Sequence, residues 1–255
     1  MTSSELIGVT WFVLKIFKIW FASISSFVTY FICLFSTFVY NNSQTTKMAK
    51  QTTSYIKLAA VSLIYLLLCI LFFTSIAIPF KIAFPVASLL ISALWVSPWQ
   101  IATALLCAAV GDVMGAKGIF LWQMGAFAMS HLFLIWYFVS RFFKMNGMTS
   151  VKNILFTTII VICVCVFAIL IIIPEVPAGI VRNGATIYAI IISIMLWCAL
   201  LQKDSAYAVG AILFVISDLV LAWNRFVSPV PYSSYMIMIP YYASQLLFFA
   251  RSVKA

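Results

Sequence analysis

GAILFVISDLVLAWNRF, residues 210–226, is an apolar run of the length that crosses a bilayer as a helix, and it carries one carboxylate, Asp218. A second run of the same kind, ALLCAAVGDVMGAKG at residues 104–118, carries Asp112. An Asp at the centre of a membrane helix opposes insertion by roughly 2.5–3.5 kcal/mol unless it is protonated, paired or hydrated. An ionisable residue inside a membrane therefore indicates a functional site by default.

The composition of the whole chain indicates a polytopic membrane protein. Of its 255 residues, 65% are hydrophobic and 8% are charged, and a soluble domain of this length cannot bury so many apolar side chains. The apolar runs lack the period-two alternation of a membrane β-barrel. The predicted fold class is therefore all-α, a transmembrane helical bundle.

Eight core spans are predicted, and short separators with turn-forming residues divide them. The spans lie at approximately 57–78, 81–96, 99–116, 119–142, 153–173, 178–202, 205–226 and 232–251. Several are short for a bilayer, so tilted or broken helices are expected. We divide the chain into an N-terminal hydrophobic extension, 1–47, and an eight-helix membrane domain, 48–255.

The extension contains one apolar segment at roughly residues 16–40. A signal peptide is the obvious alternative, but this segment is too long for one and ends without a small-residue cleavage site. We therefore expect one extra hydrophobic helix before the core, either spanning the membrane or lying at its interface.

Basic residues predict the orientation of the core. The net charge is +10, which in a soluble protein would suggest nucleic acid. Here the bases lie mostly between apolar segments, so orientation and anionic lipid headgroups explain them and no nucleic-acid partner is expected.

Nine bases fall on the side that precedes the first core span: Lys47, Lys50, Lys57, Arg141, Lys144, Lys152, Lys203, Arg251 and Lys254. The other side receives four: Lys81, Lys117, Arg182 and Arg225. The positive-inside rule makes the first side cytoplasmic and gives a multi-pass protein of the inner or plasma membrane, if bacterial, with both core termini in the cytoplasm.

The two halves of the core show a faint internal similarity. Residues 104–112 align with 210–218, so that Asp112 corresponds to Asp218. Other corresponding pairs are Phe120 with Phe226, His131 with Gln245, and Lys81 with Tyr188. Two four-helix halves related by an axis along the membrane normal would have this pattern and would place both carboxylates at similar depth.

Neither a metal nor a cofactor is predicted. His131 is the only histidine, and the six cysteines lie inside apolar runs without a CxxC pair. No nucleotide-binding loop, HExxH or GxSxG motif is present.

Taken together, these stretches resemble the lysoplasmalogenase-like (YhhN-like) family of integral membrane proteins. The resemblance covers about residues 57–250, and residues 210–226 are its most specific part. The matching stretches are Lys81 in PFKIAFP, Gly111-Asp112, Phe127 to His131, Tyr188 to Met195, Gly210 to Asn224, and Tyr242 to Gln245. The family implies eight helices, a lysophospholipid substrate, and an ether hydrolase that cleaves the vinyl-ether bond of lysoplasmalogens. The products would be a fatty aldehyde and a glycerophospho-headgroup.

The two buried carboxylates suit this chemistry. A vinyl ether is labile to acid, and its hydrolysis begins with protonation of the alkenyl carbon. In a buried pair of carboxyls, one can keep its proton at neutral pH while the other is ionised. We therefore predict Asp112 and Asp218 as the catalytic general acid and base. The sequence does not assign the two roles, although Arg225, about 10.5 Å further along the same helical face, favours Asp218 as the ionised member.

Seven further residues are predicted to contact the substrate: Lys81, His131, Tyr188, Asn224, Arg225, Tyr242 and Gln245. Each has a structural alternative. Lys81 could bind the phosphate or extend to the interface, His131 could orient a carboxylate or be a satisfied core residue, and Asn224 could bind the headgroup or cap its helix.

Two other functions fit the same residues. A lipid or proton-coupled transporter would also use parallel repeats and intramembrane acids. A non-catalytic membrane scaffold would use the acids as hydrogen-bonding groups between helices. The sequence does not indicate an oligomeric state.

Overall fold

The computed structural model describes residues 48–144 and 150–253, with side chains from Leu58 onward. The chain divides into two compact units, Met1–Lys57 and Leu58–Ala255, and the second of these holds the helical bundle. The extra helix expected within residues 1–47 lies outside the described residues, and the boundary predicted at residue 47 stays a prediction.

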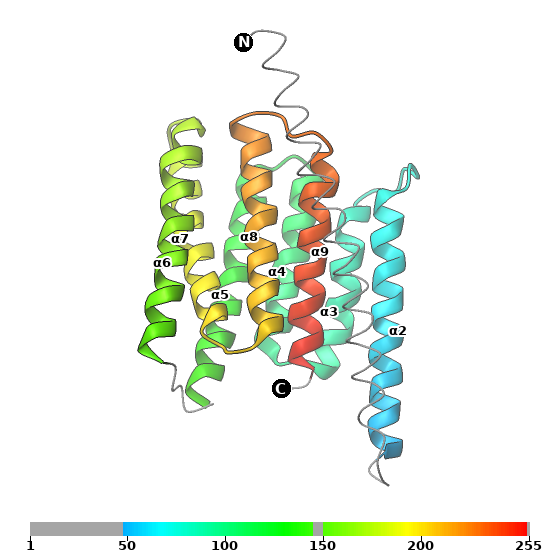
Figure 1. Ribbon diagram of the computed structural model, residues 1–255. Helices are drawn as coiled ribbons and strands as arrows, with labels where there is room; N and C mark the ends of the chain where they lie inside the picture. The colour runs from blue at the N-terminus through cyan, green and yellow to red at the C-terminus, as the bar shows by residue number, and fades with distance from the viewer. Residues whose placement is uncertain (1–47, 145–149, 254–255) are drawn as a thin grey trace, which may run out of the picture. The chain divides into compact units, whose positions relative to one another are not determined.

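Eight α-helices and no strand make up the described part of the chain, which confirms the all-α fold class (Figure 1). They are α2 (Met48–Phe73), α3 (Phe84–Val96), α4 (Trp99–Ala116), α5 (Phe120–Lys144), α6 (Val151–Phe167), α7 (Ile180–Leu200), α8 (Ser205–Phe226) and α9 (Ser233–Ser252). Five spans in this part are long and apolar enough to cross a membrane: α4, α5, residues 151–175, α7 and α8. The protein is an integral membrane protein with a bundle of the predicted type.

Local sequence accounts for where several helices begin. Pro85 occupies the first turn of α3 and Pro98 is the N-cap of α4, positions where a missing N–H costs no hydrogen bond. At the start of α8, the Asp204 side chain accepts a hydrogen bond from the Ala206 N–H at 3.2 Å. Asp is among the preferred residues at this position because its carboxylate satisfies an otherwise unpaired backbone donor.

The span that begins with α6 changes its helical geometry before it ends. After Phe167, residues 168–172 form a π-helical segment and residues 173–175 a short 3₁₀ turn. π-Helical turns are rare in proteins as a whole, and those that occur are often found at functional sites. Along α6, large apolar side chains such as Leu155 and Phe156 are exposed, as expected for a surface that faces lipid tails.

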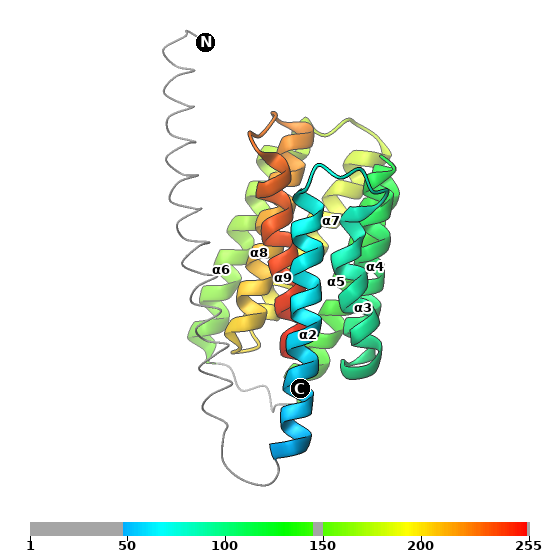
Figure 2. The same ribbon diagram turned by 90° about the vertical axis from the view of Figure 1, so that its right-hand side faces the viewer.

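The helices pair in a pattern that repeats between the two halves. The most extensive pairs are α4 with α5 and α8 with α9, and both figures of the whole chain show these pairs side by side (Figure 1, Figure 2). The pair α3–α4 corresponds to α7–α8, and α5–α7 corresponds to α9–α3. This is the arrangement expected of two four-helix halves with the same orientation.

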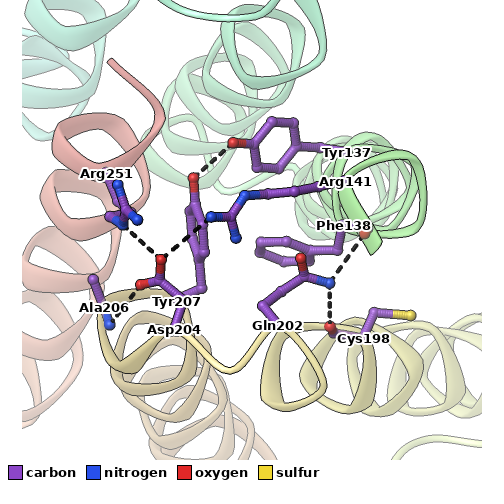
Figure 3. A network of polar contacts seen from close by, with 9 residues as sticks. All are labelled: Tyr137, Phe138, Arg141, Cys198, Gln202, Asp204, Ala206, Tyr207 and Arg251. Carbon is purple, nitrogen blue, oxygen red and sulfur yellow. Dashed lines mark hydrogen bonds and ion pairs between the residues drawn. The ribbon is translucent and has the colours of Figure 1, made fainter. Parts of the chain in front are cut away.

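An ionic network ties three helix ends together at the lower end of the bundle in Figure 1. Asp204 at the start of α8 accepts a hydrogen bond from Arg251 of α9 at 2.6 Å and lies 3.5 Å from Arg141 of α5 (Figure 3). The Arg141 guanidinium also stacks over the ring of Tyr207, 5.0 Å from its centroid. The network therefore fixes the register of α5, α8 and α9 at this end.

Candidate active site

Three residues predicted from the sequence meet where α5, α7 and α8 come together. The Tyr188 hydroxyl of α7 donates a hydrogen bond to the Asp218 carboxylate of α8. The His131 Nε2 atom of α5 lies 3.0 Å from the same hydroxyl and 3.7 Å from Asp218 Oδ2. Because Tyr188 has one hydroxyl proton and gives it to Asp218, the contact with His131 requires Nε2 to be the donor. The imidazole is completely buried, and its Nδ1 atom has no hydrogen-bond partner in the described structure.

Asp218 and Tyr188 line a cavity between α5, α7, α8 and the span that contains α6. The empty space in this cavity, counted out to its mouth and including the open solvent there, is about 790 Å³. Its walls are almost entirely apolar, and the polar side chains among them are Gln123, Tyr188, Ser193 and Asp218. Among the described residues, no hydrogen bond reaches Asp218 Oδ1, so this oxygen is available to a molecule in the cavity.

Regular stripes on two helices build the cavity wall. On α7 the lining residues are Ala185, Tyr188, Ala189, Ile192 and Ser193, which follow the i, i+3, i+4, i+7, i+8 spacing of a single helical face. The opposite face of α7 is apolar and exposed, for example at Ile187 and Ile190. The helix therefore presents one face to the cavity and the other to lipid.

Gln123 is a cavity residue that the sequence analysis missed. A Cβ atom on Gly115 would lie 2.5 Å from the Gln123 amide nitrogen, so the glycine makes room for this side chain against α4. Gly184 does the same for Met124, whose Cε would be 2.6 Å from an added Cβ. In the sequence, Gln123 stands out as an amide within the apolar 119–142 span. The sequence does not show, however, which face of the helix this side chain occupies.

Asp112 has a different environment. It is 2% exposed, accepts a hydrogen bond from the Tyr241 hydroxyl of α9 at 2.9 Å, and is not among the residues that line the cavity. The Tyr241 ring packs edge-on against Phe127 and Phe214, at centroid distances of 5.8 and 5.5 Å. Asp112 and Asp218 therefore have separate hydrogen-bonding partners, and the joint catalytic role predicted for them stays a prediction.

Two of the other predicted residues bind backbone near the turn between α2 and α3. The Lys81 ammonium donates to the carbonyls of Thr74 and Ile76 at 2.5 and 3.0 Å, and so closes this turn. The Tyr242 hydroxyl donates to the Ile82 carbonyl at 2.8 Å. Neither Lys81 nor Tyr242 is among the cavity-lining residues.

The remaining three predicted residues lie on α8 and α9. Asn224 accepts a hydrogen bond from the Val230 N–H at 2.8 Å, which holds the loop after α8. Arg225 is exposed and stacks on Phe120, which lines the cavity. Gln245 is 3% exposed, and its Nε2 atom has no partner in the described part of the chain.

The described residues contain no group of three or more His, Cys, Asp or Glu side chains that could hold a metal ion.

Comparison with known proteins identifies the family. The family model described as the YhhN family matches residues 76–253. The lysoplasmalogenase TMEM86B of Sus scrofa is 34% identical over 145 residues, which are 56% of this chain and 59% of that protein. The Homo sapiens lysoplasmalogenases TMEM86B and TMEM86A are 36% identical over 145 residues and 28% identical over 164 residues. These matches cover 56% and 59% of this chain, and 59% and 64% of the two human proteins.

The matched part of the chain thus spans less than two thirds of the length of these relatives. No solved structure matches this protein. The family match extends over more than half of the sequence and includes Asp112, His131, Tyr188 and Asp218. The chain belongs to the YhhN family of integral membrane proteins.

Proposed function

We propose that this protein is a lysoplasmalogenase, a membrane hydrolase that cleaves the vinyl-ether bond of a lysoplasmalogen into a fatty aldehyde and a glycerophospho-headgroup. The observation that carries the proposal is one carboxyl group, Asp218, on the wall of an otherwise apolar cavity and hydrogen-bonded by Tyr188. Relatives named lysoplasmalogenase support the substrate class. An apolar slot with a single acidic group is suited to a lipid whose reactive bond adjoins its hydrocarbon tail.

Asp218 acts as the general acid in this proposal. The proton passes from its carboxyl to the alkenyl carbon that is not bonded to oxygen. The double-bond electrons form the new C–H bond, and an oxygen lone pair forms the C=O⁺ bond of an oxocarbenium ion. The Tyr188 hydroxyl, which already donates to Asp218 Oδ2, stabilises the carboxylate that remains. The proton is delivered from Oδ1, the oxygen that has no partner among the described residues.

Water then completes the reaction. It adds to the oxocarbenium carbon and transfers a proton to the Asp218 carboxylate, which restores the acid. The resulting hemiacetal breaks its bond to the glycerol oxygen, and that oxygen takes the hydroxyl proton as the aldehyde carbonyl forms. The apolar walls hold the tail and limit the number of water molecules that reach the cation.

For Asp112 we propose a positioning role. Its carboxylate binds the Tyr241 hydroxyl, and the Tyr241 ring contacts Phe127, which is part of the cavity wall. Asp112 would therefore act on the cavity through the packing of Tyr241 and Phe127. The alternative is the shared pair of catalytic carboxyls that the sequence suggests.

Mass spectrometry of purified protein incubated with a lysoplasmalogen and with an ester lysolipid tests the activity. We expect aldehyde from the first lipid and no cleavage of the second. Asp218→Asn should lower kcat by roughly 10²-fold or more, because a positioned general acid contributes about 10²–10⁴-fold. Asp112→Asn should retain kcat within about 10-fold.

Full turnover in a folded Asp218→Asn protein would reject the assignment of the acid. Equal losses in the two Asn variants, at unchanged thermal stability, would instead favour the shared pair. Movement of intact lipid across vesicles in response to a proton gradient, without aldehyde, would favour a transporter.

We also propose that the side with nine bases, at which α9 ends, faces the cytoplasm, as the positive-inside rule indicates. Labelling of single cysteines introduced at the two ends of α9 by an impermeant reagent in intact cells tests this orientation. Labelling from outside at the C-terminal end would reverse it.

A further inference from the structure

A guanidinium group without an ion-pair partner among the described residues stacks on two aromatic rings of the cavity wall. Arg225 lies at the end of α8, and its guanidinium carbon is 4.1 Å from the centroid of Phe120 and 5.9 Å from that of Phe226. Both rings line the cavity. Within the described part of the chain, no carboxylate lies within 4.0 Å of Arg225, so its charge is available to an anion.

A second arginine, Arg182, binds the backbone of a cavity-lining residue, although neither Arg182 nor Arg225 is itself among the lining residues. The Arg182 Nε atom donates to the Val176 carbonyl at 2.8 Å, and Nη2 donates to the Pro174 carbonyl at 3.1 Å. Val176 lines the cavity. Glu175 is the acidic residue closest in the sequence, but no ion pair joins it to Arg182. The two carbonyls therefore hold the guanidinium in place while its Nη1 atom has no hydrogen bond among the described residues.

Helical geometry places both arginines toward one end of the cavity. Helices α7 and α8 are consecutive and run in opposite directions, and the hydrogen bond from Tyr188 to Asp218 puts these two residues at one level. Arg225 lies about 10.5 Å beyond Asp218 along α8, and Arg182 lies about 9 Å before Tyr188 along α7, at 1.5 Å per residue. Both shifts point to the upper end of the bundle in Figure 1, where α7 begins and α8 ends.

The separation matches the geometry of a lysophospholipid. The helical rises to Arg182 and Arg225 are about 9 and 10.5 Å, and the glycerol unit that joins the vinyl ether to the phosphate extends, together with an arginine side chain, over a distance of this order. Guanidinium groups bind phosphate through paired, charge-assisted hydrogen bonds and are the preferred side chains for this purpose. Lys81, the phosphate ligand suggested by the sequence, instead donates to the carbonyls of Thr74 and Ile76.

We propose that Arg182 and Arg225 bind the phosphate of the lipid headgroup and make the protein select lysolipids that carry a phosphate on the glycerol. The inference rests on the proposed function for the reaction that follows binding. The alkenyl tail then extends past Asp218 toward Ile192 and Ser193, in the opposite direction from the phosphate.

The test compares an alkenyl lysophospholipid with an alkenylglycerol that lacks the phosphate. For Arg182→Gln and Arg225→Gln, we expect KM for the phosphate-bearing lipid to rise roughly 10-fold or more, because a hydrogen bond to a charged group contributes about 1.5–3 kcal/mol. We expect kcat for this lipid and both constants for alkenylglycerol to stay near their wild-type values. Lys117→Gln is the matched control, since Lys117 lies at the same end but contacts Phe80, outside the cavity wall.

Arg182→Lys and Arg225→Lys keep the positive charge and should restore part of the lost affinity, which a purely structural role would not explain. Unchanged KM in both Gln variants, or equal losses on the two substrates, would overturn the inference.

Binding of a non-cleavable alkyl-ether lysophospholipid, measured by thermal shift, separates this inference from the proposed activity. If the wild-type protein binds this lipid and the Gln variants do not, the phosphate site stands even when no aldehyde is released. If aldehyde forms equally well from both substrates and the Gln variants bind like the wild type, the activity stands and the phosphate site fails.

Discussion

The Tyr188 hydroxyl lies between an imidazole and a carboxylate, 3.0 Å from His131 Nε2 and in a hydrogen bond with Asp218. A hydroxyl in this position can accept from the imidazole and donate to the carboxylate at the same time. It thereby holds Asp218 Oδ2, while no hydrogen bond among the described residues reaches Oδ1. At the scale of single residues, we expect Tyr188 to select which carboxyl oxygen meets the substrate.

Tyr188→Phe removes this hydroxyl and leaves the ring in place. We expect kcat for aldehyde release to fall roughly 10- to 100-fold with little change in KM, since a hydrogen bond to a charged group contributes about 1.5–3 kcal/mol. Tyr137→Phe is the matched control, because it removes a hydroxyl from the buried Tyr137–Tyr207 contact of 2.6 Å, away from the cavity. Equal kcat values for the two variants would contradict the role of Tyr188.

Helix α7 lines the cavity with one face and exposes apolar side chains on the other. Small and large residues alternate along its cavity stripe, and Ser193 is the last cavity-lining residue of the helix. The Ser193 hydroxyl already donates to the Ala189 carbonyl at 2.7 Å, so it needs no further partner. We expect position 193, the last cavity-lining position along α7, to limit how far an apolar tail can extend beyond Asp218.

Ser193→Leu should shift the preference of the protein toward shorter tails. The added side chain occupies space at the end of the cavity, and each methylene of the tail that loses its place costs about 1–3 kcal/mol. Turnover of a series of lysoplasmalogens that differ in tail length measures the shift. Ile190→Leu, on the exposed face of the same helix, is the control. A uniform loss across the series would show that position 193 does not limit tail length.

Helices α3–α5 and α7–α9 pair in similar patterns, but different side chains surround the aspartate in each set. The helix pairing around Asp218 is repeated around Asp112, but tyrosine side chains occupy the second location. Tyr241 binds the Asp112 carboxylate, and the Tyr65 hydroxyl donates to the Tyr242 carbonyl at 2.7 Å. We infer that Asp112 does not line the cavity because Tyr241 fills the space beside it, whereas Ala185, Ala189 and Ala222 leave space on the wall that carries Asp218.

The ionic network of Asp204, Arg141 and Arg251 lies at the opposite end of the bundle from Arg182 and Arg225. It holds α5 of the first set of helices in register with α8 and α9 of the second. Asp204→Asn keeps a residue that caps helices well but removes the charge that pairs with Arg141 and Arg251. Because the Arg251 side chain is 34% exposed, solvent screening reduces the effect, and we expect a loss of about 1–3 kcal/mol in unfolding free energy. Denaturation in mixed micelles measures it. Glu175→Gln, at an exposed carboxylate without an ion pair among the described residues, should leave stability unchanged; a comparable loss there would contradict this explanation.

Local sequence was sufficient to locate the helices of the core. The spans expected at 99–116 and 205–226 coincide with α4 and α8, because a backbone in a bilayer must satisfy its hydrogen bonds within each segment. The partner of each buried polar side chain, by contrast, depends on the tertiary structure. Helical periodicity assigns a face to Asp112 or Asp218, but the neighbouring helix determines what that face meets. In the folded chain Asp112 meets Tyr241, whereas Asp218 meets Tyr188 and an open cavity, because contacts between residues distant in sequence depend on how the helices pack.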